Sequence, residues 1–343
     1  MNKSIVIVFA IVLFFSCSEK SKTSQQVMNS DSFTIALGSC YKTSLNDNSI
    51  WKEVIKNKPD SWIWLGDIVY ADTEDMSKMK QEYDLLKYDK EYQKLVKTSE
   101  VIGIWDDHDY GANDGGKAFP KKKQSKIQLL NFLDVDPSNS VFDHEGIYNS
   151  YTYGKGNRKI KVLLLDTRYF RDGLIRNSNK GNGYKVNETG DILGEEQWKW
   201  LAGELEKNEA AVHIIASGYQ VIAWEPFFEK WSNFPVARAR LFELLKRSNP
   251  NRAFLLSGDR HISEVAKLDL DGLNYPLYEF TCSGLTHTWS EIWPEENRYR
   301  VTDLIVEKNF GLINIEWNGD VPSITFEIRG KDNQLFTSFS PKF

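Results

Sequence analysis

The sequence is poor in the features that mark disulfide-rich, membrane-spanning or nucleic-acid-binding proteins. It has only three cysteines in 343 residues, at positions 17, 40 and 282, which excludes a small disulfide-dense scaffold. It has no apolar run of the roughly 20 residues that a membrane-spanning helix needs. Its 43 basic and 48 acidic residues give a net charge of −5, so we expect no nucleic-acid-binding surface.

The chain does contain enough apolar material for a folded core. Hydrophobic residues make up 41% of it and aromatic residues 13%, which excludes a disordered chain. From residue 32 onward, no repeat and no Pro/Gly/Ser-rich linker divides the sequence. We therefore expect a single domain over residues 32–343.

The amino terminus has the pattern of an export signal. Lys3 precedes an apolar run over residues 5–15, and Ser16 and Cys17 follow at once. This order resembles the lipobox of bacterial lipoproteins, which implies a lipoprotein signal peptide over residues 1–17 and lipidation of Cys17; an ordinary secretory signal is the alternative. Residues 18–31, rich in Ser, Lys and Gln, would form a flexible tether. We expect an exported protein, lipid-anchored to the bacterial cell envelope, either periplasmic or surface-exposed.

Apolar runs of strand length alternate with amphipathic helical stretches along the rest of the chain. Several of these runs are apolar throughout, as in sheets that are covered on both faces. The pattern predicts an α/β fold with two sheets packed together between helices. We expect strands at 33–39, 61–65, 101–105, 160–165, 211–216, 253–257, 277–281, 311–317 and 323–328, and helices at 50–56, 76–97, 125–133, 195–207 and 237–246.

Polar residues follow the carboxyl ends of successive predicted strands, where ligands and catalytic groups gather in α/β sheets. Taken alone, each group has an ordinary explanation. The Gly-Asp pairs could be turns, His261 could be a satisfied core histidine, and Cys40 could form a disulfide with Cys282. Three carboxylates at 106, 107 and 109, however, would repel one another without a cation. The groups are GSC at 38–40, GDIVY at 66–70, WDDHD at 105–109, LDTR at 165–168, SGYQ at 217–220 and SGDRH at 257–261.

Apart from SGYQ, these groups together with LGEEQW at 193–198 resemble the ordered motif set of the alkaline phosphatase D-like metallophosphatases. The similarity runs from about residue 33 to about residue 289. It implies the calcineurin-like metallophosphoesterase fold, a four-layer sandwich of two mixed β-sheets flanked by helices. It also implies hydrolysis of phosphodiesters, phosphomonoesters or both, by in-line attack of a metal-bound hydroxide.

The resemblance implies a centre with more than one metal ion. One ion would be held by Cys40, Asp67, Tyr70 and His261, and Asp67 would bridge to a second ion held by Asp107 and Asp259. In the family such centres are associated with ferric iron and calcium. A thiolate and a phenolate suit a transition metal and carboxylates suit calcium, with zinc and manganese as alternatives.

Other residues near these motifs have more than one possible role. His108 is expected to contact the phosphate or protonate the leaving oxygen, or else to orient Asp107. Arg168 could clamp phosphate oxygens or form a buried pair with Asp166. Arg260, Gln220 and His287 are candidate substrate-binding residues, and the loop residues Trp224, Trp231, Trp289 and Trp293 could form core packing or an aromatic lip.

We expect a small-molecule or lipid phosphate ester as substrate, the membrane as a partner through the lipid anchor, and a monomer. Two other functions are consistent with parts of the pattern. A non-catalytic, metal-stabilised surface lipoprotein could bind a phosphorylated ligand with a closed coordination shell. A glycosidase using Asp106 and Asp109 would leave Cys40 and Tyr70 without a role.

Overall fold

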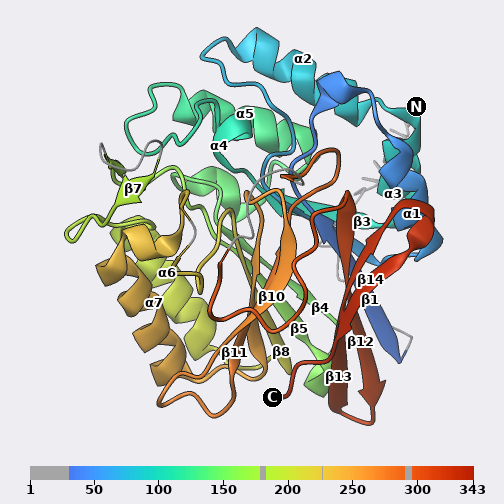
Figure 1. Cartoon of the computed structure of the whole chain (residues 1–343), viewed down its shortest axis with the longest axis vertical. Coiled ribbons are helices and arrows are strands. Elements are labelled where there is room, and N and C mark those ends of the chain that lie inside the picture. Colours follow the sequence, from blue (N-terminus) through green and yellow to red (C-terminus); the bar gives the residue numbers. More distant parts are fainter. Residues whose placement is uncertain (1–30, 178–182, 226, 290–295) are drawn as a thin grey trace, which may run out of the picture.

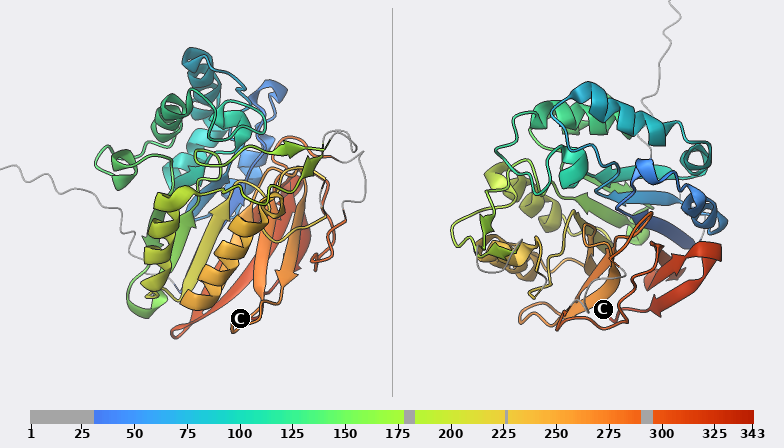
Figure 2. Two further views of the ribbon diagram at one scale, coloured as in Figure 1. Left: turned by 90° about the vertical axis from the view of Figure 1, so that its left-hand side faces the viewer. Right: turned by 45° about the horizontal axis from the view of Figure 1, so that its top comes forward.

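The structure is a computed structural model, and it describes residues 31–177, 183–225, 227–289 and 296–343. Cys17, the predicted signal peptide and nearly all of the predicted tether lie outside the described residues, as does Trp293. Two six-stranded sheets pack face to face and are flanked by helices (Figures 1 and 2). Among the described residues, none of the helices combines the length and the apolarity needed to cross a bilayer.

The first sheet combines three parallel strands with an antiparallel carboxyl-terminal meander. β1 pairs in parallel with β2, and β2 with β3, while β12 lies antiparallel to β1 on the other side. The strand order is β14-β13-β12-β1-β2-β3. Its strands are β1 (Ser32–Gly38), β2 (Ser61–Leu65), β3 (Glu100–Ile104), β12 (Asn309–Asn318), β13 (Val321–Gly330) and β14 (Leu335–Phe339).

The second sheet has a parallel centre and an antiparallel strand at each edge. β5, β8, β9 and β11 run parallel, whereas β4 and β10 pair antiparallel at the edges. The order is β10-β11-β9-β8-β5-β4. Its strands are β4 (Asn149–Tyr153), β5 (Ile160–Leu164), β8 (Val212–Ser217), β9 (Ala253–Ser257), β10 (Ser263–Leu268) and β11 (Leu277–Cys282), and a separate ribbon joins β6 (Ile175–Arg176) to β7 (Tyr184–Lys185).

Helices cover the outer faces of both sheets, so the predicted α/β class and four-layer order are confirmed. α6 and α7 stand side by side against the second sheet, and α1 and α3 lie beside the first (Figure 1). One core joins the facing sheets and includes Ile35, Phe280 and Phe326, while a second lies under α6 and α7. The helices are α1 (Ser49–Lys56), α2 (Met76–Lys87), α3 (Lys90–Thr98), α4 (Asp107–Tyr110), α5 (Lys122–Phe132), α6 (Gly194–Glu206) and α7 (Pro235–Ser248).

All nine predicted strands are present, but the single predicted helix at 76–97 is wrong. It divides into α2 and α3 because Asp89 adopts an extended backbone and caps the second helix. Its carboxylate accepts hydrogen bonds from the backbone N–H groups of Glu91 and Tyr92, both at 2.9 Å. The edge strands β4, β10 and β14 were not predicted. β4 and β14 are partly exposed, and Glu264 and Lys267 interrupt β10, so none of the three forms a strong apolar run.

Candidate metal centre

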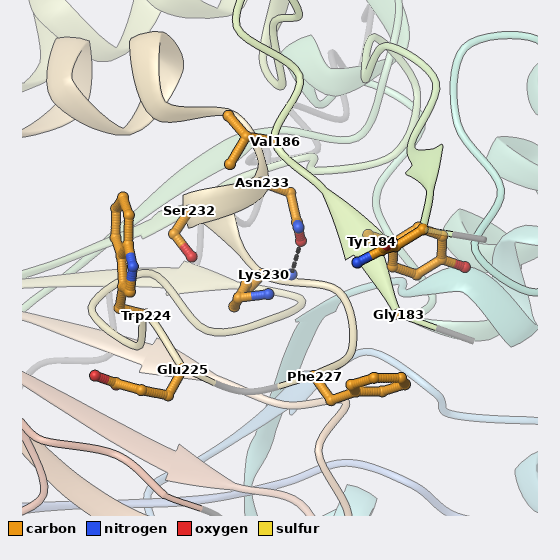
Figure 3. A pocket seen from close by; sticks show the side chains of 10 residues that line it. Gly183, Tyr184, Val186, Trp224, Glu225, Phe227, Lys230, Ser232 and Asn233 are labelled. Atoms are coloured by element: carbon orange, nitrogen blue, oxygen red, sulfur yellow. Dashed lines mark hydrogen bonds between the residues drawn. The ribbon is translucent and has the colours of Figure 1, made fainter. Parts of the chain in front are cut away.

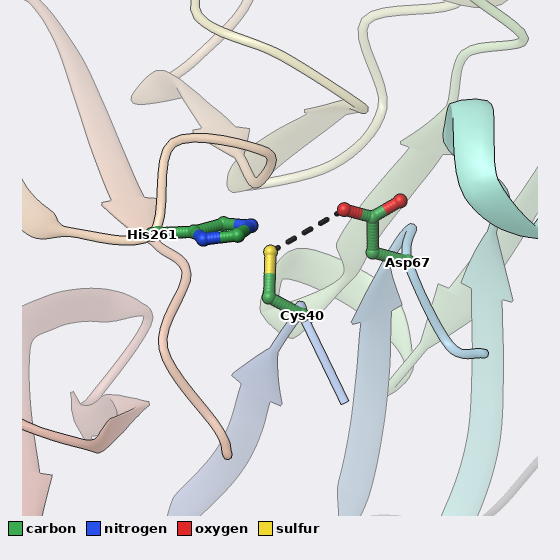
Figure 4. Close-up of side chains that lie close together, drawn as sticks. All are labelled: Cys40, Asp67 and His261. Atoms are coloured by element: carbon green, nitrogen blue, oxygen red, sulfur yellow. Dashed lines mark hydrogen bonds between the residues drawn. The ribbon is translucent and has the colours of Figure 1, made fainter. Parts of the chain in front are cut away.

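The predicted ligands of the first metal come together where β1 and β2 end. Cys40 lies just beyond β1, Asp67 just beyond β2, and His261 reaches them from the loop after β9 (Figure 4). The Cys40 Sγ atom is 3.4 Å from Asp67 Oδ2, and one ligand atom from each of these three residues lies within 4.8 Å of the others. The Tyr70 hydroxyl is 3.0 Å from His261 Nε2 and 3.3 Å from Asp67 Oδ2. A thiol, a carboxylate, a phenol and an imidazole therefore share one small space.

A strained backbone supports this convergence. Cys40, Asp67, Asp259 and His261 all have φ between 50° and 66°, in the left-handed region that non-glycine residues rarely occupy. Such strain persists where surrounding structure fixes it, and it clusters at functional sites. Gly66, with φ of 85°, lets β2 turn against the end of β3, because a Cβ atom there would lie 2.4 Å from the Cβ atom of Asp106.

Four carboxylates form a second group beside the first. Asp67, Asp106, Asp107 and Asp259 each place one oxygen within 4.8 Å of the others. Asp67 belongs to both groups, which is the geometry that a bridging ligand requires. Asp107 is held in place by the backbone N–H of His108 at 2.9 Å, which bonds to Oδ1, and by that of Asp114 at 2.7 Å, which bonds to Oδ2.

The electrostatics of this cluster fit a cation. Burial and the neighbouring carboxylates raise the pKa of Asp67 well above its usual value, and burial raises the pKa of Asp259 to about 7. Burial and the adjacent Asp67 also raise the pKa of the Cys40 thiol. Asp67 Oδ1 and Asp106 Oδ2 are buried and have no hydrogen-bond partner among the described residues. Buried carboxylate oxygens without partners are costly, and oxygen, nitrogen and sulfur donors together suit metal ions. The residues present therefore fit a metal centre.

His108 lies at the edge of the cluster. Its Nδ1 atom is 2.7 Å from Asp72 Oδ2, and its ring packs on the Tyr70 ring with the centroids 4.1 Å apart. Burial lowers its pKa, but the hydrogen bond with Asp72 and the charge of Asp107 outweigh burial and raise the pKa above the ordinary value. His108 also lies close enough to Asp67 and Asp107 to share a metal ion with them. The geometry therefore fits His108 as a metal ligand and also as a proton donor.

Arg168 lies behind the metal centre and is fully buried. The sequence alternative of an Arg168–Asp166 ion pair is wrong, because Arg168 donates to the Asp166 carboxylate through its backbone N–H and not through its guanidinium. Instead, the guanidinium contacts Asp106 Oδ1 through Nε and a terminal nitrogen, both at 2.7 Å, and it contacts Glu229 Oε2 at 2.6 Å. Both contacts to Asp106 fall on one oxygen, and Oδ2 has no hydrogen-bond partner among the described residues. A phosphate clamp by Arg168 stays a prediction. All three guanidinium nitrogens already contact Asp106 or Glu229.

The three predicted substrate-binding residues, Gln220, Arg260 and His287, have different surroundings. The amide nitrogen of Gln220 is buried and donates to Glu264 at 2.8 Å and to Thr281 at 3.1 Å. Arg260 is buried, 3.8 Å from Asp259 Oδ2, with its guanidinium over the Phe228 ring. His287 is half-buried, and its ring lies 4.4 Å from that of His261.

The two cysteines of the domain do not form a disulfide. Cys40 and Cys282 are both free and buried, so the disulfide considered from the sequence is excluded. Cys282 lies at the end of β11, where its thiol contacts the backbone oxygen of Leu37 at 3.7 Å and Asn309 Oδ1 at 3.4 Å. Cys40 is therefore left available as a ligand.

Sequence reasoning gave no role to several residues that shape the site. Asp106 was named within its motif, but its neighbour Asp107 took the ligand role. Ser283, whose hydroxyl is 3.0 Å from the Cys40 thiol, and Asp72, which binds His108, follow no motif signal. Glu229 lies in a loop without a recognisable pattern, so its two arginine partners appear only in the folded chain.

Comparisons with known proteins find a matching family and a similar fold. The family model described as PhoD-like phosphatase matches residues 35–309. Alkaline phosphatase D of Bacillus subtilis (strain 168) is 23% identical over 287 residues, which make up 71% of this chain and 48% of that protein. This chain therefore spans about half the length of that curated relative.

A solved structure of PhoD superposes with a TM-score of 0.68 at 18% identity, covering 92% of this chain and 73% of that one. This similarity bears on the fold alone, and it agrees with the two flanked sheets. The family model covers most of the described domain and includes every predicted metal ligand. The resemblance predicted from the motifs is thus confirmed, and the chain belongs to the PhoD-like phosphatase family.

Proposed function

We propose that the chain is a metal-dependent phosphoesterase that hydrolyses phosphodiesters, phosphomonoesters or both. The observation that carries this proposal is the pair of ligand groups sharing Asp67, with buried carboxylate oxygens that lack other partners. Metal ions held there would polarise phosphoryl oxygens and lower the pKa of a water molecule. Ferric iron on the side of Cys40 and Tyr70, and calcium among the carboxylates, fit the donor types, with zinc and manganese as alternatives.

The protein's own residues supply orientation and proton transfer. Asp72 fixes the His108 ring through Nδ1, so the Nε2 atom is the one left to protonate a leaving alkoxide. The ring also rests on Tyr70, which ties its position to the first ligand group. We assign Arg168 and Glu229 to holding Asp106 in place, because both are buried and paired. Arg260 and His287 stay candidates for substrate contact.

We also propose that the mature protein is exported and anchored by a lipid on Cys17, and that it acts as a monomer on small-molecule or lipid phosphate esters. Export and anchoring rest on the apolar run at 5–15 followed by Ser16 and Cys17. Metabolic labelling with a palmitate analogue tests the anchor. A Cys17→Ser variant should lose the label, and retention of the label by that variant would refute lipidation.

The catalytic proposal is tested with a nitrophenyl phosphate monoester and a bis-nitrophenyl phosphate diester. Hydrolysis is measured with the full chain before chelation, after chelation, and after iron, calcium, zinc or manganese is restored. Cys40→Ser should lose both bound metal and turnover. Cys282→Ser is the matched control, since Cys282 is also a free, buried cysteine but contacts none of the ligands in the described structure.

Two outcomes contradict the proposal. If turnover persists after complete chelation, the reaction does not depend on the metal centre. If metal binds at a defined stoichiometry and neither ester is hydrolysed, the alternative of a non-catalytic protein that binds a phosphorylated ligand is favoured. If metal-dependent hydrolysis is observed instead, the ratio of diester to monoester turnover defines the substrate class.

A further inference from the structure

A pocket lies between the loop before α7 and the β6–β7 ribbon, outside the ligand groups (Figure 3). Its volume is about 200 Å³. Trp224, Phe227 and Tyr184 give it aromatic walls, and Lys230 and Asn233 give it polar groups. Ligand sites are typically about 300–1,000 Å³, so this pocket suits one short branch or a single ring of a larger ligand.

Lys230 is the unusual member of this pocket. Its side chain is only 6% exposed, and Figure 3 shows it between Trp224 and Tyr184. The ammonium group donates to the backbone oxygen of Phe228 at 3.0 Å. An ammonium has three donors, and among the described residues this is its single hydrogen-bond partner. A buried cation with unused donors is stabilised when an anion occupies the pocket.

Among the described residues, the acidic side chains near Lys230 already have cationic partners. Glu229, whose charge acts on Lys230, is paired with Arg168 and Arg171. Glu225 lines the pocket, but it is paired with Arg298. Burial and the nearby Arg260 lower the pKa of Lys230 to about 8, and the charge of Glu229 opposes this shift. Lys230 is the cationic side chain among the described residues that line the pocket.

A row of aromatic rings joins the pocket to the metal centre. The Trp289 ring stacks on the His261 ring at 4.8 Å and on the Phe228 ring at 6.3 Å. Phe228 contacts Phe227 at 5.6 Å, and Phe227 lines the pocket. Phe227, Phe228, Trp224 and Trp289 are each at least 37% exposed, so this row forms an accessible apolar strip. Trp231, by contrast, is fully buried in the core.

We propose that this pocket binds one alcohol group of a phosphodiester substrate, and that Lys230 selects a group that ends in an anion. The inference rests on the proposed phosphoesterase function. The phosphodiester would lie at the metal centre, and its organic chain would cross the aromatic strip. A charged hydrogen bond to Lys230 would then favour a carboxylate or a second phosphate over a neutral end.

The test compares two esters that differ only in terminal charge: nitrophenyl carboxydodecyl phosphate and nitrophenyl carbamoyldodecyl phosphate. Their chains are long enough to follow the row of rings from the metal centre to Lys230. The metal-loaded full chain should hydrolyse the carboxylate ester with a kcat/KM about tenfold higher. Lys230→Gln should bring this ratio close to one. Lys52→Gln, which removes an exposed lysine on α1, should keep it. A ratio near one in the unaltered protein, or an unchanged ratio in Lys230→Gln, overturns the proposal.

A binding measurement separates this proposal from the hydrolytic function. Isothermal titration calorimetry is done with the matching pair of phosphinates, in which methylene groups replace both bridging oxygens. If neither ester is hydrolysed but the carboxylate phosphinate binds about tenfold tighter through Lys230, the hydrolytic function fails and the pocket assignment holds. If both esters are hydrolysed without preference and the phosphinates bind equally, the pocket assignment fails alone.

A second variant covers the case in which Lys230→Gln does not fold. Phe227 is 42% exposed, so Phe227→Ala should fold normally. Loss of its ring should weaken both phosphinates about fivefold, because both chains cross the same aromatic surface. Unchanged dissociation constants in this variant overturn the proposed path of the organic group.

Discussion

Replacing Glu229 with glutamine should lower the free energy of unfolding by about 3 kcal/mol. Glu229 is 2% exposed and contacts two fully buried arginines, Arg168 at 2.6 Å and Arg171 at 3.1 Å. In the described structure, Asp106 is the other acidic partner of Arg168. Glutamine keeps the shape of the side chain but removes its charge, so two buried guanidinium groups would face a single carboxylate.

The magnitude follows from the difference between buried and exposed ion pairs. Removing one partner of a buried pair costs about 3–5 kcal/mol because the other charge stays desolvated. We take the lower end, since the terminal nitrogens of Arg171 also donate to the backbone oxygens of Asp114, Gly115 and Asp172. Glu209 is the control, because its pair with Lys159 at 2.8 Å is exposed.

The assay is urea denaturation of both variants and of the unaltered protein, with the m-value compared among them. Glu209→Gln should leave the free energy of unfolding unchanged within the error of the measurement, because its ion pair is exposed to solvent. A Glu229→Gln variant that is equally unaffected, at an unchanged m-value, would refute the view that the buried charges depend on one another.

Four other perturbations have expected outcomes. Removing metal should lower the free energy of unfolding, because the carboxylates around Asp67 then lose their counter-charge. The loss should be roughly 3 kcal/mol if the free ion had been at about 100 times its Kd. A melting temperature that is the same before and after chelation would contradict this. His108→Gln should reduce kcat far more than metal content, and equal losses of both would instead make His108 a ligand. Asp89→Ala should cost about 1 kcal/mol because α3 loses its cap. Asp75→Ala should cost less because the cap of α2 is exposed to solvent, and thermal unfolding compares the two variants. Burial lowers the pKa of His213, so the folded state disfavours its charged form, and the protein loses stability through this group as pH falls below about 6.5. The free energy of unfolding in urea should therefore fall less between about pH 7.5 and 5 in His213→Gln than in the unaltered protein. Parallel pH profiles of the two proteins would rule this out.

Local patterns predicted the strands because the central strands are buried on both faces. β2 and β9 are buried at every position, and each appears in the sequence as an apolar run bounded by polar residues, WIWL at 62–65 and AFLL at 253–256. The break between α2 and α3 escaped the same reasoning. The helical periodicity continues across residue 88, and only the capping geometry of Asp89 ends it.

The candidate site was also predicted in part from local patterns. Cys40, Asp67, Asp107 and Asp259 each follow a predicted strand, and parallel strands bring such positions to one edge of a sheet. Sequence position did not indicate that Arg168 would bind Asp106 rather than the nearby Asp166. That pairing joins side chains 62 residues apart and depends on how the two sheets face each other.

The sequence by itself determined the family, the order of the strands along the chain and the side chains that gather at their ends, because each of these depends on local residue type and spacing. Only the tertiary structure decided which carboxylate oxygens have no hydrogen-bond partner and that Arg168 is paired with Asp106 and Glu229. It also decided that the buried Lys230 lines a pocket from which aromatic rings lead to the metal centre. These properties arise from contacts between distant segments, and the packing of the two sheets fixes those contacts.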